Sequence, residues 1–405
     1  MRKVIDFFRT EVYIPDEKFK FFFRWMFICS GIAYLNYAIP FAPDTLFGFN
    51  WTGIAWIVML CIIFLVIFRI ERPTFPFYFW APWVIYMIGS VIASYSFVGL
   101  QLTFQYMIPI LVGVIASSFS YSWPKIFWLF QQLSKLVVFI YVLFLAYYLT
   151  TGYAAHMPTT PMIFIVLGSI CLGSYYVLKQ KFYLFIFFIL FIMPFVSVTR
   201  MALLVFLVTF VFHFSNSSIR NKIIYGFLGL GLGLIVFTSE GFQKKTFFEG
   251  DGELSEIGLD LYDNEQLNNN GRKAWQISLA PGLAANPIWG NGPRADNAVL
   301  KDIIGEGSAE AHNDYLSVTY NYGAFGLTLL LIGIISTFLL IFKNSFAQTN
   351  PLGKIIFGSV LTLFFGYMLF MATDNILKYT IFFPNYFYAL IGITFSIHKK
   401  GWSYL

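Results

Sequence analysis

"AHNDYLSVTYNYGAFGLTLLLIGIISTFLLIF", residues 311–342, decides the fold class, because its second half is a long, almost uncharged apolar run. A helix of about 20 apolar residues is enough to cross the hydrocarbon core of a bilayer. The whole chain has the same character: 58% of its 405 residues are hydrophobic and 11% are charged, and its mean hydropathy is +0.71. A soluble protein cannot bury that much apolar surface, so the sequence predicts a polytopic membrane protein.

Further apolar runs lie on both sides of this stretch and predict an all-α fold with about twelve transmembrane helices. All three cysteines fall inside such runs, which argues against a disulfide framework and against a cysteine-based metal site. The predicted spans are 21–39, 47–68, 77–97, 100–119, 126–149, 161–178, 182–196, 200–214, 223–238, 315–342, 355–373 and 380–397.

Lysine and arginine are concentrated in alternate loops, so the positive-inside rule places both termini in the cytoplasm. Residues 1–238 then hold helices one to nine, residues 239–313 form one large extracytoplasmic loop, and residues 314–405 hold helices ten to twelve. That loop carries twelve acidic and six basic residues. The net charge of +6 therefore reflects topology, and nucleic acid is not an expected partner.

The catalytic motifs of soluble enzymes are missing from the sequence. It has no HExxH, GxSxG or Walker A motif, and no dinucleotide-binding glycine pattern. A metal-dependent or nucleotide-using enzyme is therefore disfavoured, and no cofactor is expected. Chemistry outside the cytoplasm needs a substrate that carries its own activation.

Two arginines on the predicted outer face are candidate anion ligands. Arg200, in "VSVTRMALLVF", lies at the outer end of an apolar run, where an arginine is costly unless it is paired or hydrated. Arg272, in "NNGRKAWQISLA", lies at the start of a predicted amphipathic helix, which is a natural anion site. The structural alternatives are a snorkelling arginine at a helix end and a solvated surface charge.

His312 is the candidate base. It precedes Asn313 and Asp314 at the outer end of the predicted helix 315–342, and a neutral imidazole can accept a proton near neutral pH. Glu310 or Asp314 could orient its ring. The alternative is an interfacial histidine that caps the helix.

Two arginines and one base on the same membrane face suit a diphosphate leaving group and a hydroxyl nucleophile. Arginines neutralise the charge that develops on the leaving phosphate, and the histidine removes the proton of the attacking hydroxyl. Asn313, Asp314, Glu310, Arg294 and Trp275 are possible supporting residues. A transporter of lipid-linked oligosaccharides, with the arginines as substrate contacts, is the alternative from another class. It is less favoured because transporters place charge near the midplane.

Four motifs in order resemble those of the bacterial O-antigen ligase and polymerase superfamily. They are "SVTRMALLVF" (197–206), "GRKAWQISL" (271–279), "NPIWGNGP" (286–293) and "AHNDYLSVTYNYGAFGLTLLL" (311–331). The sequence departs from the family at Met201, where a small residue usually follows the arginine. The clear similarity covers residues 197–331.

The resemblance implies a GT-C-like membrane glycosyltransferase of the bacterial inner membrane, with its active site facing the periplasm. Its donor would be a glycan on undecaprenyl diphosphate, held by Arg200 and Arg272, with His312 as the base and no metal. In a polymerase, the favoured reading, the acceptor is another lipid-linked repeat unit and a chain-length regulator is a possible partner. In a ligase the acceptor is the lipid A core.

Overall fold

The computed structural model describes residues 12–38, 45–46, 49–151, 160–196, 199–214, 272–304 and 311–402, with isolated positions between 223 and 243. This described part is helical apart from one short antiparallel pair of strands, β1 (Thr45–Leu46) and β2 (Phe49–Asn50). The predicted all-α class is therefore confirmed for the described residues, with that pair as a small exception.

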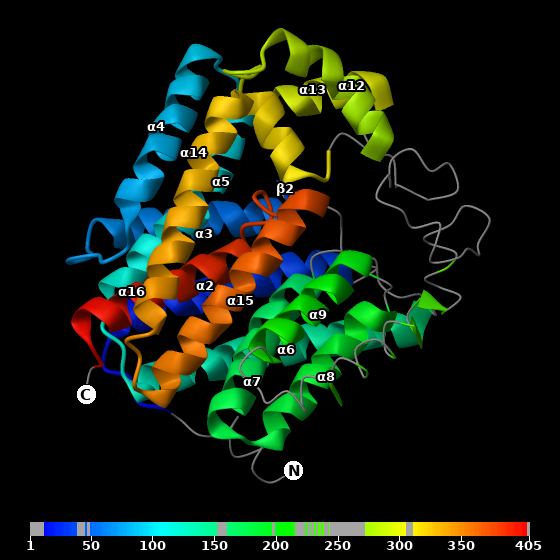
Figure 1. The fold of residues 1–405 in the computed structure, drawn as a ribbon. Coiled ribbons are helices and arrows are strands. Elements are labelled where there is room, and N and C mark those ends of the chain that lie inside the picture. Colours follow the sequence, from blue (N-terminus) through cyan, green and yellow to red (C-terminus); the bar gives the residue numbers. More distant parts are fainter. Residues whose placement is uncertain are drawn as a thin grey trace.

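The helices mostly coincide with the predicted apolar segments (Figure 1). Eleven of the twelve predicted segments match a helix, and residues 223–238 lie mostly outside the described residues. The helices are α2 (Glu17–Ala38), α3 (Trp51–Ile67), α4 (Phe77–Ala93), α5 (Phe97–Ser118), α6 (Trp123–Thr151), α7 (Thr160–Leu178), α8 (Lys181–Val196), α9 (Arg200–Phe214), α12 (Arg272–Ala285), α13 (Ala295–Ile304), α14 (Asp314–Ser345), α15 (Pro351–Thr373) and α16 (Pro384–Lys400).

Within the described part, α5, α6, α14 and α15 are long and apolar enough to cross a membrane, and five shorter apolar helices accompany them. The multi-pass membrane class is thus supported by the structure, while the total of twelve spans stays a prediction. Helices α12 and α13 lie at one end of the helix bundle (Figure 1). Of these two, the sequence predicted only α12.

Helix α4 packs along α14 and aligns it with the rest of the bundle. The indole N–H of Trp80 donates to the hydroxyl of Thr337 over 2.9 Å. Nearer the end that carries α12 and α13, the ring of Trp83 packs edge-on against Tyr322 at a centroid distance of 5.1 Å. A buried indole normally finds a polar partner, as Trp80 finds Thr337. The Trp80–Thr337 and Trp83–Tyr322 contacts together fix how α14 lies against α4.

Helix α14 consists of two helical segments that meet at Gly323, where φ is 69° and ψ is 178°. The continuous helix predicted over 315–342 is therefore wrong at this residue, and Figure 1 shows the change of direction. The backbone groups released at the break bond to residues 287–292 instead. A helix in a membrane can break only where such partners are available.

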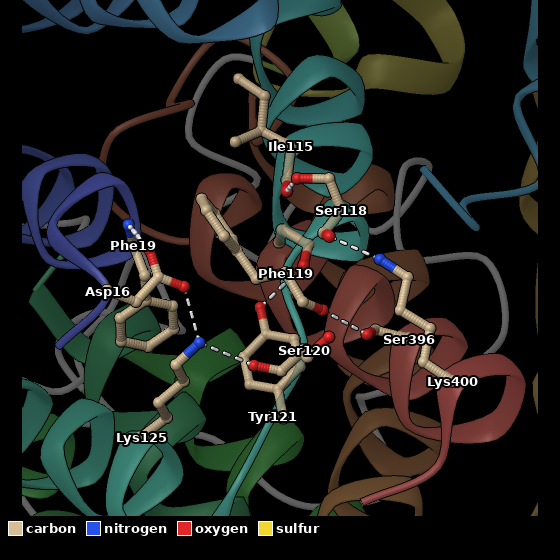
Figure 2. A network of polar contacts seen from close by, with 11 residues as sticks. Asp16, Phe19, Ile115, Ser118, Phe119, Ser120, Tyr121, Lys125, Ser396 and Lys400 are labelled. Carbon is tan, nitrogen blue, oxygen red and sulfur yellow. Dashed lines mark hydrogen bonds and ion pairs between the residues drawn. The ribbon is translucent and has the colours of Figure 1, made fainter. Parts of the chain in front are cut away.

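A polar network closes the opposite end of the bundle, on the predicted cytoplasmic side (Figure 2). Lys125 pairs with Asp16 at 2.7 Å and also donates to the carbonyl of Ser120. The Lys400 ammonium donates to the carbonyl of Ser118 over 2.5 Å. These contacts join α6 to the residue before α2 and to the connection between α5 and α6, and they join α16 to the end of α5. They lie far from the residues that the sequence singles out for chemistry.

Candidate functional site

His312 lies between a carboxylate and an indole ring. Its Nδ1 is 3.3 Å from Oδ1 of Asp374, and its ring centroid is 5.3 Å from that of Trp275, with the planes at 41°. The side chain keeps 41% of its surface exposed. With Nδ1 donating to Asp374, Nε2 carries the lone pair and is the ring nitrogen that can accept a proton.

Asp374 is the C-cap residue of α15, and this position fixes its carboxylate. Its backbone N–H donates to the carbonyl of Phe370, and its Oδ1 accepts from the N–H of Asn375 over 2.9 Å. The sequence interpretation missed this residue. The available signal was a lone acid at the outer end of an apolar run, in "FMATDNIL".

Asn313 and Asp314 hold the backbone on either side of the site. The Asn313 side chain caps α14 by accepting from the N–H of Leu316 over 3.0 Å. The Asp314 side chain is fully buried, and its Oδ2 accepts from the N–H of Leu377 over 2.9 Å. Asp314 thus fastens the start of α14 to the turn after α15. This contact brings His312 and Asp374 together, and it is Asp374 that contacts the imidazole.

Trp275 joins α12 to the histidine. It is buried in a small cluster with Leu279, Leu300, Ala311 and Tyr320, which packs α12 and α13 onto the start of α14. Arg272 begins α12, one turn before Trp275, and residues three apart share a helix face. The backbone therefore brings the start of α12 close to His312. The side chain of Arg272 and the whole of Glu310 lie outside the described residues.

Arg200 begins α9, and its side chain is partly buried. Helix α9 runs antiparallel to α15: Val205 contacts Gly366, while His213 lies 3.2 Å from the hydroxyl of Thr362. If the same antiparallel register continues to the start of α9, Arg200 lies beside the last turn of α15. Asp374 caps that turn. The structure thus gathers Arg200, Arg272 and His312 at one end of the bundle.

Residues 286–293, the third motif, fill the break in α14. The N–H groups of Asn291 and Gly292 donate to the carbonyls of Tyr320 and Asn321 over 2.9 Å each. The N–H groups of Ala324 and Phe325 donate to the carbonyls of Pro287 and Ile288. The motif therefore replaces the hydrogen bonds that α14 loses at Gly323.

Two glycines make this contact possible. Both have positive φ, at Gly290 (78°) and Gly323 (69°). A Cβ on Gly290 would lie 2.4 Å from the nitrogen of Gly323, and one on Gly323 would lie 2.0 Å from the carbonyl oxygen of Ile288. Only residues without a Cβ allow the two segments to approach so closely.

Arg294 follows this motif, in a left-handed conformation with φ 70°, and its side chain is partly buried. Two residues on, buried Asp296 accepts from the hydroxyl of Ser317 over 2.5 Å and from the amide of Asn321 over 2.9 Å. These bonds attach the start of α13 to the first segment of α14. Arg294 therefore lies directly before the residues that attach α13 to the helix that follows His312.

Among the described residues, no three histidine, cysteine or acidic side chains gather closely enough to hold a metal ion. A cavity of about 410 Å³ lies between α3 and α5 and is mostly apolar. Its lining includes Trp56, Phe97 and Gln101, and none of the candidate site residues.

Residues 184–331 match the family model described as O-antigen ligase. This match confirms the resemblance to the O-antigen ligase and polymerase superfamily that the four motifs indicated. No curated protein matches the chain. The matched stretch holds Arg200, Arg272, Arg294 and His312, whereas Asp374 lies beyond it.

Proposed function

We propose that the chain is a GT-C-like membrane glycosyltransferase that moves a glycan from undecaprenyl diphosphate to an acceptor hydroxyl, at the periplasmic face of the bacterial inner membrane. The observation that carries this proposal is the 3.3 Å contact between Nδ1 of His312 and the carboxylate of Asp374. Such a contact fixes one ring nitrogen as donor and leaves the other as base.

In the proposed reaction, Nε2 of His312 takes the proton of the acceptor hydroxyl. The hydroxyl oxygen forms a bond to the anomeric carbon of the donor sugar, and the bond from that carbon to the diphosphate oxygen breaks. The electron pair of the broken bond stays on the leaving diphosphate. A single displacement of this kind inverts the anomeric configuration. Asp374 stabilises the imidazolium that forms.

Arg200 and Arg272 bind the donor diphosphate and neutralise the charge that it gains as it leaves. A guanidinium suits this role because its planar fork matches phosphate oxygens and stays charged at every physiological pH. The partly buried position of Arg200 at the first turn of α9 supports the assignment. Since arginines supply the positive charge, the proposed reaction is metal-independent.

The acceptor defines two versions of the same chemistry. In the polymerase version, which we favour, the acceptor is a second lipid-linked repeat unit. In the ligase version it is the lipid A core. Glycan analysis of a deletion strain separates them: core bearing one repeat unit indicates a polymerase, and bare core with accumulated lipid-linked polymer indicates a ligase.

The direct test is glycan transfer by the purified protein in lipid vesicles, with a lipid-linked donor and each acceptor in turn. His312→Ala should lower the rate about a hundred- to ten-thousandfold, the usual contribution of a general base. His312→Gln is the matched variant, because glutamine forms hydrogen bonds but does not accept a proton. Full activity of His312→Gln would remove His312 from the role of base. Movement of the lipid-linked donor across the bilayer without any glycan transfer would instead indicate a transporter.

A further inference from the structure

Helix α12 exposes an apolar surface although it lies outside the predicted spans. Every exposed residue of α12 whose side chain the structure describes is apolar. The largest of these side chains, Ile277, is 64% exposed. The opposite side carries Trp275 and Leu279, which are buried against α13 and α14. The exposed set is Ala274, Ile277, Ala280, Pro281, Ala284 and Ala285.

The exposed apolar surface continues into the motif that follows α12. Ile288 is 56% exposed and Trp289 is 65% exposed. The Trp289 ring lies 5.2 Å from that of Phe325, at the start of the second segment of α14. Phe325 in turn begins the exposed stripe of that membrane-capable helix, which includes Ile332, Ile335 and Leu339.

The depth of Trp289 can be read from α4. The hydroxyl of Tyr86 lies within donating distance of the Trp289 carbonyl, at 2.9 Å, and of the Tyr322 carbonyl, at 3.1 Å. Tyr86 precedes the last residue of α4, Ala93, by about two turns, or roughly 10 Å along the helix axis. Trp289 therefore lies at the level of α4 residues that are themselves exposed and apolar, among them Ile85 and Ile88.

We propose that this surface, from Ile277 of α12 to Ile288 and Trp289, contacts the lipids of the outer leaflet, so that α12 is an interfacial helix and not part of a water-filled loop. Its continuity with the exposed faces of α4 and α14 identifies the occupant as lipid. An interfacial helix places its apolar face at the boundary of headgroups and acyl chains, with its charges toward water. Arg272 and Lys273 open α12, so this placement keeps cations at the level of lipid phosphates.

The test measures the surroundings of single nitroxide labels in vesicles of phosphatidylethanolamine and phosphatidylglycerol. Cys61→Ala provides the background, because Cys61 is exposed while Cys29 and Cys171 are buried. Ile277→Cys and Ile288→Cys carry the label. Ile332→Cys on the exposed face of α14 is the lipid reference, and Asp302→Cys on α13 is the water reference. The labels are exposed in turn to oxygen, which concentrates in lipid, and to a water-soluble nickel chelate.

Labels at positions 277 and 288 should collide mainly with oxygen, like the lipid reference at position 332. They should be protected from the nickel chelate, unlike the water reference at position 302. Nickel accessibility at both positions equal to that at 302 would overturn the proposal. Protection from both agents would also overturn it, because protein would then cover the surface, either the undescribed residues before Arg272 or a second copy of the chain. The readout needs no enzymatic activity, so it does not depend on the proposed reaction.

Discussion

At the scale of single residues, the two neighbours of His312 act differently. The Asp374 carboxylate accepts from Nδ1 when that nitrogen carries the proton, while the Trp275 ring packs beside the imidazole. A carboxylate in this position stabilises the imidazolium formed during proton removal. The amide of an asparagine keeps the size of the side chain but loses the negative charge.

We therefore expect Asp374→Asn to lower kcat about ten- to a hundredfold, a part of the full contribution of a general base, while KM changes little. The measurement is glycan transfer by the purified variant, alongside wild type and His312→Ala. The double variant His312→Ala, Asp374→Asn should be no slower than His312→Ala alone, because Asp374 acts through the histidine. Additive losses in the double variant would show that Asp374 acts independently.

The two arginines give a second prediction at this scale. Arg200→Ala and Arg272→Ala should each slow transfer about a hundredfold, since the loss of one charged contact to a developing anion costs about 3 kcal/mol. Lysine should restore only part of the rate at either position, because an ammonium lacks the planar fork. Lys273→Ala is the matched control beside Arg272. A normal rate for Arg272→Ala at equal expression would exclude that residue from the site.

Sequence alone predicted the helix that carries Trp275. It also singled out the histidine and the arginines as candidates, because charged or titratable groups beside apolar runs are conspicuous. It did not predict Asp374, which lies 62 positions after His312 in the chain. Nor did it predict the buried role of Asp314, which bonds to the backbone of Leu377. Both contacts depend on how the start of α14 packs against the end of α15 and the turn after it. No local sequence pattern specifies that packing.

At the scale of elements, the break in α14 adjusts its length to the membrane. An unbroken helix of 32 residues would be about 48 Å long, whereas the segment after Gly323 is about 33 Å long, close to the thickness of the hydrocarbon core. Hydropathy predicted the bounds of α14 to within a few residues but not the break. The break depends on hydrogen bonds from residues 287–292, which lie elsewhere in the sequence.

Gly323→Ala should therefore destabilise the protein. The backbone conformation at φ 69° and ψ 178° is essentially restricted to glycine and costs about 1–3 kcal/mol for other residues, and the new Cβ would meet the carbonyl of Ile288. Gly89→Ala is the control, since Gly89 lies in α4 with open space around its Cβ position. There alanine should be neutral or slightly stabilising, by up to about 1 kcal/mol. The apparent midpoint of thermal unfolding in detergent compares the two. Equal midpoints for both variants would contradict the fitted contact at Gly323.

At the scale of the whole molecule, the two ends of the bundle differ in chemistry. One end carries His312, Asp374 and the outer helices, and the other carries the network of Asp16, Lys125 and Lys400 (Figure 2). The positive-inside rule assigns the second end to the cytoplasm. This orientation stays a prediction from the cation pattern of the sequence, which needs only the order of helices and loops.

Single cysteines test the orientation in spheroplasts, again in the Cys61→Ala background. Asp302→Cys, on α13, should react with a membrane-impermeant thiol reagent, whereas Ala347→Cys, between α14 and α15, should react only after the membrane is opened. Both positions are exposed, so accessibility within the fold does not separate them. Reaction at 347 and not at 302 would reverse the topology and place the site in the cytoplasm.

The fitted contact between Gly290 and Gly323 also limits how this protein can be recombined with its relatives. Each glycine approaches the backbone of the other segment. A chimaera that takes residues 286–293 from one parent and residues 320–325 from another therefore joins two segments whose backbones are not fitted to each other. Helix α4 contributes to the same junction through the hydroxyl of Tyr86 and through the ring of Trp83, which packs on Tyr322. Residues 286–293 and 320–325 therefore have to be exchanged together, along with the α4 residues that pack against them.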